Sequence, residues 1–355
     1  MFKLLRHISF VFGEERAHHL AVALLRLADS MPCVKWLLHK LYAVEHPKLE
    51  REVFGMRFKN PVGLAAGFDR NGEIFRTAGA LGFGFVEIGT VTPLPQQGNP
   101  RPRVFRLPDD CAILNRIGLA SKGLERVICN LRHSHEGIII GCNIGKNSVT
   151  PAEEAPTDYL RVFRNLYQYV DYFTVNVSYN TTFKQYVPRT RESVCQILEP
   201  LFDFRRGQNI YRPILLKISP DLSDEEVDIM TDIMMDTPLD GIVATNATTR
   251  PSGLKTPGET LKRIGCGAVS GAPLTKRAVE VVRRIHERSH GTYPIIGTGG
   301  LMTTDDVRAM LDAGATLVQI YTGYVYNGVK FVGDICRALI QDETKTPEQP
   351  SDTTL

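Results

Sequence analysis

The sequence predicts an α/β fold, a (β/α)8 TIM barrel preceded by an N-terminal helical extension. Eight short apolar, β-branched runs recur along the chain, most of them separated by stretches with helical spacing, and nearly every run ends in a polar residue or a glycine. This alternation favours a closed parallel barrel, whose active site lies at the carboxyl ends of its strands. The runs are Val62–Ala66, Gly84–Thr90, Ile138–Asn143, Asp171–Asn176, Pro213–Lys217, Asp240–Asn246, Pro294–Thr298 and Leu317–Tyr321.

Two amphipathic helical stretches precede the first run. The first carries apolar residues at helical spacing between Ala17 and Ala28, and the second, between Val34 and Leu41, contains the only tryptophan, Trp36. Such a pair suits contact with a membrane surface, although it could equally pack on the barrel as a plug. We therefore expect a helical region over residues 1–50, a barrel over 51–342 and a disordered tail over 343–355.

The composition gives no support for a nucleic-acid-binding, metal-binding or membrane-spanning protein. The 355 residues carry a net charge of +3 with interspersed signs, which gives no argument for nucleic acid as a partner. The seven cysteines show no metal-ligand spacing, so we expect free thiols and no metal site. We find no apolar run long enough to cross a bilayer, and we do not interpret the basic, apolar start as a signal peptide.

Two long loops, called excursions below, follow the second and the fourth predicted strands. Residues 91–120 are rich in Pro and Gly and contain two alternating runs, which predict a hairpin around Pro108-Asp109-Asp110. Residues 178–190 follow the fourth strand and are expected to form a lid or loop. Long loops on the catalytic face of a barrel are usually functional.

The strand ends carry the candidate chemistry. The Gly297-Thr298-Gly299-Gly300 segment at the end of the seventh strand and Tyr321-Thr322-Gly323 at the end of the eighth predict a phosphate site, although plain tight turns would give the same pattern. Lys217 ends an apolar strand, where it could form a Schiff base, face an electron-rich ring, or reach solvent at the rim. Four amides suit a flat imide ring such as a pyrimidine or flavin; they are Asn115, Asn143, Asn176 and Asn246.

These residues lie within motifs that resemble dihydroorotate dehydrogenase. The similarity covers about residues 10–340 and includes NPVGLAAGFDRNGE, GFVEIGTVTPLPQQGNPRPRVFRL, NRIG, NIGKN, VNVS, LLKISPDL, GIVATNAT, SGAPL, PIIGTGG and LVQIYTG. The long N-terminal helical region resembles the membrane-associated, quinone-reducing class (class 2). The resemblance implies oxidation of dihydroorotate to orotate in pyrimidine (UMP) biosynthesis, with FMN as cofactor and ubiquinone or menaquinone as electron acceptor.

The resemblance also implies roles for individual residues. FMN contacts fall at Ala66, Gly67, Thr90, Asn143, Asn176, Lys217, Thr245, Gly271, Gly300, Tyr321 and Thr322. Substrate contacts fall at Arg70, Asn115, Arg116, Ile117, Gly118, Leu119, Asn176, Asn180 and Asn246. A quinone tunnel between the N-terminal helices would be lined by His18 and Arg106. The class implies a peripheral membrane protein, which we expect at the cytoplasmic face of the cell membrane.

The chain departs from the family pattern mainly on the substrate side. The family has Lys where this chain has Arg70, Phe-Asn where it has Leu119-Ala120, and Thr where it has Ala247. The family loop N-V-S-S-P-N-T carries the catalytic serine as its second Ser, whereas this chain reads Asn-Val-Ser-Tyr-Asn-Thr from Asn176. A one-residue deletion makes Ser178 the base, and an ungapped alignment makes it Tyr179.

Two other functions stay open at the level of sequence. One is an FMN oxidoreductase of the same fold that acts on a different substrate, such as another pyrimidine. The other is a flavin-binding or membrane-binding protein that has lost catalysis. Anaerobic bleaching of the flavin by dihydroorotate discriminates best, because only a dihydroorotate dehydrogenase reduces its flavin with that substrate.

Overall fold

Eight parallel strands close into the predicted barrel. The computed structural model describes residues 13–132, 137–178 and 188–345. Around the barrel, each strand pairs in parallel with both neighbours, and β13 closes the circle onto β3. The strands are β3 (Val62–Leu64), β4 (Phe85–Val91), β7 (Ile139–Ile144), β8 (Tyr172–Asn176), β9 (Ile214–Ile218), β10 (Gly241–Ala244), β12 (Ile295–Thr298) and β13 (Leu317–Ile320). The fold class and all eight strand positions are therefore confirmed.

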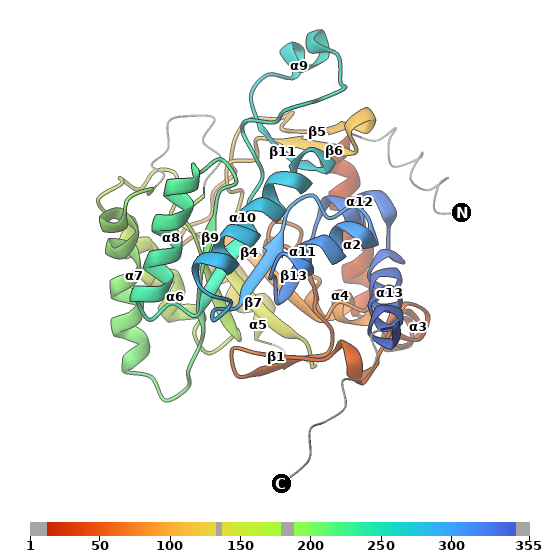
Figure 1. The fold of residues 1–355 in the computed structure, drawn as a ribbon, viewed down its shortest axis with the longest axis horizontal. Helices are drawn as coiled ribbons and strands as arrows, with labels where there is room; N and C mark the ends of the chain where they lie inside the picture. Colours follow the sequence, from red (N-terminus) through yellow and green to blue (C-terminus); the bar gives the residue numbers. More distant parts are fainter. Residues whose placement is uncertain (1–12, 133–136, 179–187, 346–355) are drawn as a thin grey trace.

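Helices cover the outside of the barrel (Figure 1). Apolar stripes hold them to the strands, and capping boxes at Thr190, Ser223 and Thr303 begin three of them. The helices are α4 (Phe75–Ala80), α5 (Leu124–Leu131), α6 (Ala155–Leu166), α7 (Arg191–Arg206), α8 (Asp224–Asp236), α10 (Thr275–Arg288), α11 (Thr304–Asp312), α12 (Thr322–Asn327) and α13 (Phe331–Lys345). Helix α13 continues to Lys345, so the first three residues of the expected tail are helical; residues 346–355 lie outside the described part.

The amino-terminal end of the barrel is filled by apolar side chains. One buried layer comes from six strands, and the hairpin of β1 (Arg51–Val53) and β2 (Met56–Phe58) packs Val53 and Phe58 against it. The layer consists of Phe85, Tyr172, Leu215, Val243, Ile296 and Leu317. Our sequence reading placed no strand before Val62 and so missed this hairpin, which closes the end of the barrel opposite the predicted site.

The next interior layer is polar. Side chains two residues apart on a strand share a face, so the residues two positions after those of the apolar layer also point into the barrel. These positions are buried and are occupied by Glu87, Asn143, Thr174, Lys217, Thr245, Thr298 and Gln319. A core layer of this kind is expensive unless its groups are hydrogen-bonded or meet a ligand, and the layer lies at the carboxyl ends of the strands.

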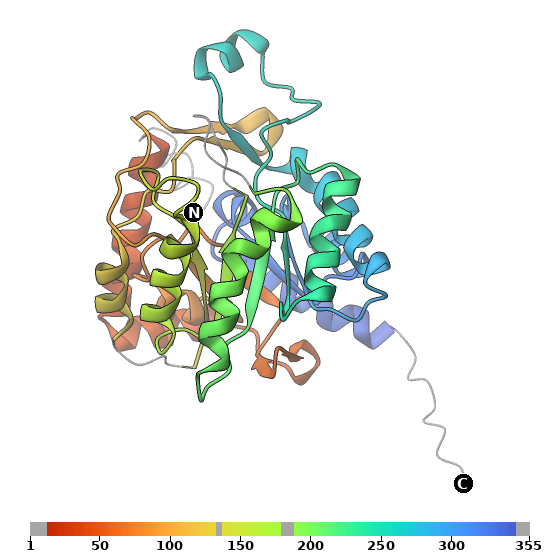
Figure 2. The same cartoon turned by 90° about the vertical axis from the view of Figure 1, so that its left-hand side faces the viewer.

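The first excursion forms a small antiparallel sheet above the barrel mouth. Strands β5 (Val104–Leu107) and β6 (Ala112–Asn115) flank a short helix η2 (Pro108–Asp110), as predicted. A third strand, β11 (Ala268–Gly271), pairs with β6 and leads into η3 (Ala272–Leu274). Helix α9 (Gly258–Ile264) projects beyond this sheet, at the end opposite the β1–β2 hairpin (Figures 1 and 2).

The N-terminal helices pack beside the barrel mouth. Helix α2 (Glu14–Asp29) contacts α4 and β5, and α3 (Pro32–Tyr42) lies against α2 and α4 before η1 (Pro47–Leu49) leads into the barrel. Leu25 and Leu38 pack on the core, whereas Leu24 and Trp36 are 58% and 63% exposed. One face thus packs on the barrel and another stays exposed. No helix in the described ranges has both the length and the apolarity to cross a bilayer.

Candidate active site

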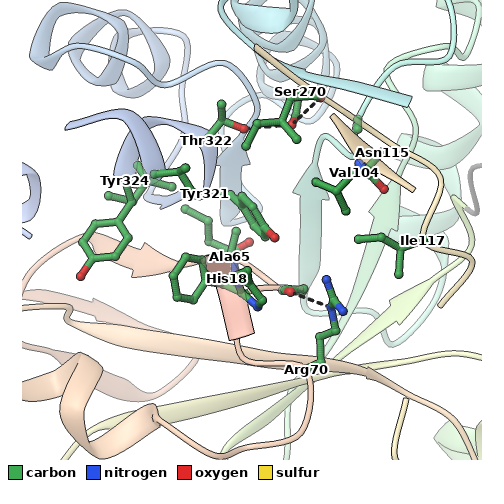
Figure 3. A pocket seen from close by; sticks show the side chains of 18 of the residues that line it. His18, Ala65, Arg70, Val104, Asn115, Ile117, Ser270, Tyr321, Thr322 and Tyr324 are labelled. Atoms are coloured by element: carbon green, nitrogen blue, oxygen red, sulfur yellow. Dashed lines mark hydrogen bonds between the residues drawn. The ribbon is translucent and has the colours of Figure 1, made fainter. Parts of the chain in front are cut away.

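A cavity of about 710 Å³ joins the barrel mouth to helix α2. Its floor comes from the polar barrel layer, one wall from β5, β6 and the segment after them, and another from α2. In Figure 3, Tyr321, His18 and Arg70 lie toward one side, while Val104, Asn115 and Ile117 form the opposite wall. Residues from distant parts of the chain therefore share one continuous space, as the carboxyl-end rule for barrels predicts.

Most of the predicted flavin-side residues line this cavity. They are Ala66, Gly67, Thr90, Asn176, Lys217, Thr245, Gly300, Tyr321 and Thr322. Two do not: Asn143 lies below the floor, where it contacts Thr90, and Gly271 lies beside Thr322 with a φ of 108°. A Cβ at Gly271 would meet the Cys111 carbonyl oxygen at 2.4 Å, so local packing alone requires a glycine there.

The predicted substrate-side residues also gather here, with one difference in role. Arg70, Asn115, Arg116, Ile117, Gly118, Leu119, Asn176 and Asn246 line the cavity, whereas Asn180 lies outside the described residues. The guanidinium of Arg116 donates to the carbonyl oxygens of Ile264, Cys266 and Pro102 and lies over the Phe105 ring. The guanidinium of Arg116 therefore ties the end of α9 and the residues after it to the sheet of β5, β6 and β11.

Lys217 is the cation of the floor. It is 5% exposed, which excludes the alternative in which it reaches solvent at the barrel rim. No hydrogen-bond or salt-bridge partner of its ammonium is found among the described residues, and burial lowers the pKa of Lys217 despite the opposing effect of Glu87. A buried cation that lacks an acceptor calls for an anionic or electron-rich ligand.

Hydrogen-bonded amides form the adjoining part of the floor. Asn143 Oδ1 accepts from Thr90 Oγ1 (2.6 Å) and from Asn176 Nδ2 (3.2 Å). Ser178 Oγ donates to Asn176 Oδ1 (3.1 Å) and accepts from Asn246 Nδ2 (2.8 Å). Ser178 is 1% exposed and does not line the cavity itself, but it contacts Asn176 and Asn246, which do. Tyr179 lies outside the described residues.

The predicted phosphate corner is built from the ends of β11, β12 and β13. Thr322 Oγ1 donates to Ser270 Oγ (2.9 Å), and Thr275 Oγ1 donates to the Gly300 carbonyl oxygen (2.6 Å). Gly300 has a φ of 76°, and a Cβ there would lie 2.4 Å from the Thr275 nitrogen. Hydroxyls and glycine backbone meet here as an anion site requires.

The opposite end of the cavity is formed by α2 and β5. His18 packs edge to face on Phe68 (5.1 Å between ring centres), and Phe68 packs likewise on Tyr321 (5.6 Å). Burial, followed by the nearby Arg70 guanidinium, lowers the pKa of His18 to about 3, so the imidazole is neutral at physiological pH. Burial also lowers the pKa of Arg106. A row of aromatic rings thus leads from α2 to the floor.

A buried ion pair fixes α2 beside the cavity. Arg103 Nη2 lies 2.6 Å from Glu15 Oε1, and Arg101 Nε lies 3.1 Å from Glu15 Oε2. Burial by itself would raise the pKa of Glu15, but these guanidinium groups bring it below its usual range. Arg103 also donates to the carbonyl oxygens of Gln97 and Asn99, so the pair joins α2 to the proline-rich excursion.

Two polar residues were missed from sequence, one in the floor (Gln319) and one below it (Glu87). Glu87 and Gln319 lie inside apolar strand runs, two residues or more before the strand ends on which we concentrated. Gln319 Nε2 donates to Glu87 (2.7 Å), and Gln319 Oε1 is buried with no partner in the described part of the chain. The period-two rule applied inside the strands could have found both. No group of three or more potential metal ligands occurs within the described ranges.

Comparison with known proteins places these features in a family. The model of the dihydroorotate dehydrogenase family matches residues 48–342. The chain is 42% identical to dihydroorotate dehydrogenase (quinone) of Christiangramia forsetii, over 95% of this chain and 98% of the relative. It is 45% identical to the protein of the same name from Thermosynechococcus vestitus, over 88% and 86%.

Solved structures agree with the sequence comparisons. The crystal structure of DHODH from Eimeria tenella in complex with ferulenol superposes with a TM-score of 0.79 at 32% identity, over 90% of this chain and 91% of that one. The ligand-free structure of the same protein gives a TM-score of 0.81 at 31% identity, over 92% and 95%. The structural similarity therefore covers about nine tenths of the chain.

Proposed function

The chain belongs to the dihydroorotate dehydrogenase family, and from this premise we propose that it oxidises dihydroorotate to orotate with bound FMN and passes the electrons to a quinone. The observation that carries the proposal is the single cavity that joins the polar floor around Lys217 to the neutral His18 beside α2. One end of this space suits a polar ring and the other an apolar electron acceptor.

The floor fits a flavin. Lys217 offers an ammonium without a protein acceptor, and Gln319 Oε1 is a buried acceptor without a donor, both within the described residues. Unsatisfied groups of both kinds indicate a site that a ligand completes. FMN bound here would supply the capacity to take up a hydride and to pass electrons on to a quinone. Thr322, Ser270 and Gly300 would hold its phosphate, while Lys217 would stabilise negative charge on the reduced ring.

The substrate would lie between the flavin and the wall formed by β6. Arg70 Nε donates to the Gly67 carbonyl oxygen (3.2 Å), which leaves the outer nitrogens of its guanidinium to pair with a carboxylate. We propose Ser178 as the base that takes the C5 proton, with Tyr179 as the alternative. The position of Ser178 against Asn176 and Asn246, which both line the cavity, supports this assignment.

The quinone would enter along α2. The tunnel residues His18 and Arg106 combine a neutral imidazole with a partly buried cation, and apolar side chains such as Leu20 and Leu24 continue the lining outward. A quinone ring with two carbonyl oxygens and an apolar tail matches this sequence of polar and apolar surfaces.

Anaerobic reduction tests the proposed reaction. The purified protein should be yellow, and dihydroorotate should bleach its flavin absorbance with release of orotate, after which a short-chain quinone should restore the colour. Bleaching by another pyrimidine but not by dihydroorotate would overturn the substrate and favour a related oxidoreductase. A colourless protein that gains no absorbance with added FMN would overturn the cofactor.

We also propose that the N-terminal helices bind the cytoplasmic surface of the cell membrane. Their outward positions are apolar, with Leu20, Leu24, Leu27, Trp36, Leu37 and Leu41 each 48–63% exposed. Vesicle flotation tests this, with residues 1–45 deleted in the comparison protein. The full chain should float and the truncated chain should not, yet the truncated chain should still bind FMN. Equal flotation or equal quinone reduction by both proteins would overturn the assignment.

A further inference from the structure

Glu87 is a buried acid that the proposed reaction does not use. It has no exposed surface and lies in the polar layer of the barrel on β4. Four donors from three other strands reach its two oxygens: Asn143 Nδ2 (2.8 Å), Thr174 Oγ1 (3.0 Å), Tyr172 OH (3.3 Å) and Gln319 Nε2 (2.7 Å). A carboxylate only accepts hydrogen bonds, so each of these groups must present a hydrogen to it.

This requirement fixes the orientation of Asn143. Because the amide nitrogen of Asn143 faces Glu87, its oxygen must face the other way, toward the cavity floor. That oxygen accepts from Thr90 Oγ1 at 2.6 Å and from Asn176 Nδ2 at 3.2 Å. The direction of these two hydrogen bonds is therefore set from below, by a group that does not line the cavity.

The same direction passes to the next residues. Since Asn176 uses its nitrogen toward Asn143, its oxygen is left to accept from Ser178 Oγ (3.1 Å) and from the Ser178 backbone nitrogen (3.1 Å). The hydroxyl hydrogen of Ser178 is thereby committed, and its oxygen accepts from Asn246 Nδ2 at 2.8 Å. Each residue in the order Asn246, Ser178, Asn176 and Asn143 therefore donates to the next one, and Asn143 donates to Glu87.

We propose that Glu87 is a positioning residue that fixes the orientation of Asn143, and through Asn143 the hydrogen bonds of Thr90 and Asn176 at the cavity floor. The hydrogen-bond chain runs through Asn143, Thr90, Asn176, Ser178 and Asn246. Three of its members, Thr90, Asn176 and Asn246, line the cavity. The inference rests on the proposed function, because its consequence is correct hydrogen bonding to FMN and to the pyrimidine substrate.

Glu87→Gln is the decisive variant because it preserves shape and removes the constraint. A glutamine both donates and accepts, so Asn143 can turn over and direct its amide nitrogen at Thr90 and Asn176. The backbone nitrogens of Ser178 and Ala247 hold Asn176 and Asn246 in their present orientation, so these two amides cannot follow. If Asn143 turns over, its amide donor faces the amide donor of Asn176 at the cavity floor, and this conflict weakens FMN binding. We expect the dissociation constant of FMN, measured by quenching of flavin fluorescence on titration of the apoprotein, to rise about tenfold to a hundredfold.

Tyr172→Phe is the matched control. It removes another hydrogen bond to the same carboxylate, but the hydroxyl lies on the side of the apolar layer and outside the chain. We expect FMN affinity within about twofold of the unmodified protein, since the direction of the chain is preserved. A loss equal to that of Glu87→Gln would show that any disturbance of Glu87 suffices, and would overturn the proposal.

A double-mutant cycle tests whether Glu87 acts through the chain. Asn143→Leu cuts the first link and leaves the carboxylate with its three other donors. If Glu87 acts through Asn143, adding Glu87→Gln to this variant should change FMN affinity little further. Additive losses, or an unchanged affinity in Glu87→Gln alone, would overturn the proposal.

Three further outcomes are decided with the help of the same titration. If Glu87→Gln does not fold, Asn143→Leu carries the test, and an FMN affinity equal to that of Tyr172→Phe overturns the proposal. If the unmodified protein binds FMN but dihydroorotate does not reduce it, the proposed reaction fails, whereas the positioning role of Glu87 is still decided by FMN affinity. If the unmodified apoprotein binds no FMN, both the cofactor and this role are overturned.

Discussion

Replacing Lys217 by Met should raise the stability of the flavin-free protein and lower its affinity for FMN. Methionine matches the length of the lysine stem and removes its charge. In the flavin-free protein the ammonium is buried without an acceptor among the described residues, and Glu87 does not approach it closely enough to form an ion pair. Because the pKa of Lys217 is lowered, the cost of burial exceeds the attraction of Glu87 at neutral pH.

The size of the effect follows from the cost of a buried, poorly compensated charge. Replacing such groups by apolar ones raises the free energy of unfolding by about 1–4 kcal/mol. With an unfolding entropy of about 2.1 cal/mol/K per residue, the 355-residue chain gains a little over 1 °C per kcal/mol. The flavin-free Lys217→Met protein should therefore melt about 1–5 °C higher than the flavin-free parent.

The effect on FMN binding has the opposite sign. A hydrogen bond to a charged group contributes about 1.5–3 kcal/mol, so loss of the ammonium should weaken FMN binding about tenfold to 150-fold. The variant should then gain less from added FMN in a melting assay than the parent does. It should also be reduced more slowly by dihydroorotate, because negative charge on the reduced ring loses its partner.

The pH dependence supplies an internal check. A lysine whose folded pKa lies below its unfolded value binds fewer protons in the folded state between the two pKa values, so the stability of the flavin-free parent should rise with pH as it approaches about 10.4. Lys217→Met should lack this rise. A flavin-free variant that melts below its parent at neutral pH would refute the reasoning, since Lys217 would then be stabilised in place.

Three further predictions concern the rest of the site. The pKa of His18 is about 3 in the folded protein, so the stability that its neutral form contributes is complete above about pH 6.5 and declines as the pH falls toward 3. In urea titrations between pH 6 and 4, the free energy of unfolding of His18→Gln should therefore fall by up to about 1.4 kcal/mol per pH unit less than that of the parent. Parallel pH profiles of the two proteins would contradict this. Ser178→Ala should slow anaerobic flavin reduction by dihydroorotate about 10²-fold to 10⁴-fold with normal reoxidation by quinone, while Tyr179→Phe should be mild, and the reverse result would make Tyr179 the base. Glu15→Gln should leave Arg103 buried without its anion, at a cost of about 3 kcal/mol in stability. We expect faster hydrogen exchange in α2 and a higher KM for quinone, with unchanged flavin reduction by dihydroorotate. Unaltered exchange would show that other contacts hold the helix.

Local sequence signals predicted the frame of the molecule well. Strand β9 is recognisable because an apolar run ends abruptly at Lys217, and the β5–β6 hairpin because two alternating runs flank Pro108. In both cases the residues that define the element lie within a few positions of one another. The period-two pattern and the turn chemistry therefore contain the information that the fold uses.

The elements that were missed depend on distant partners. Strand β11 exists because Ala268–Gly271 pairs with β6, more than 150 positions earlier, and its four residues carry no pattern of their own. The β1–β2 strands are three residues long and become ordered by packing Val53 and Phe58 beneath the barrel. Short strands of this kind are stabilised by tertiary contact, which local patterns do not encode.

The same distinction applies within the candidate site. The type and position of Arg116 were predicted, but its guanidinium is directed at carbonyl oxygens near Ile264, which only the folded chain brings within reach. Glu87 was overlooked because a charged residue inside a strand run looks like an interruption. Its meaning becomes clear only when the donors of three other strands converge on it.

The polar layer inside the barrel has a consequence for the life of the protein in the cell. A ligand that binds only the folded form adds RT ln(1 + [L]/Kd) to its stability, so a chain that has captured a flavin opens more rarely than one still waiting for it. Transient opening exposes a chain to proteases, and a difference of 1–2 kcal/mol changes abundance several-fold. The steady-state amount of this enzyme should therefore follow the supply of riboflavin, even at a constant rate of synthesis.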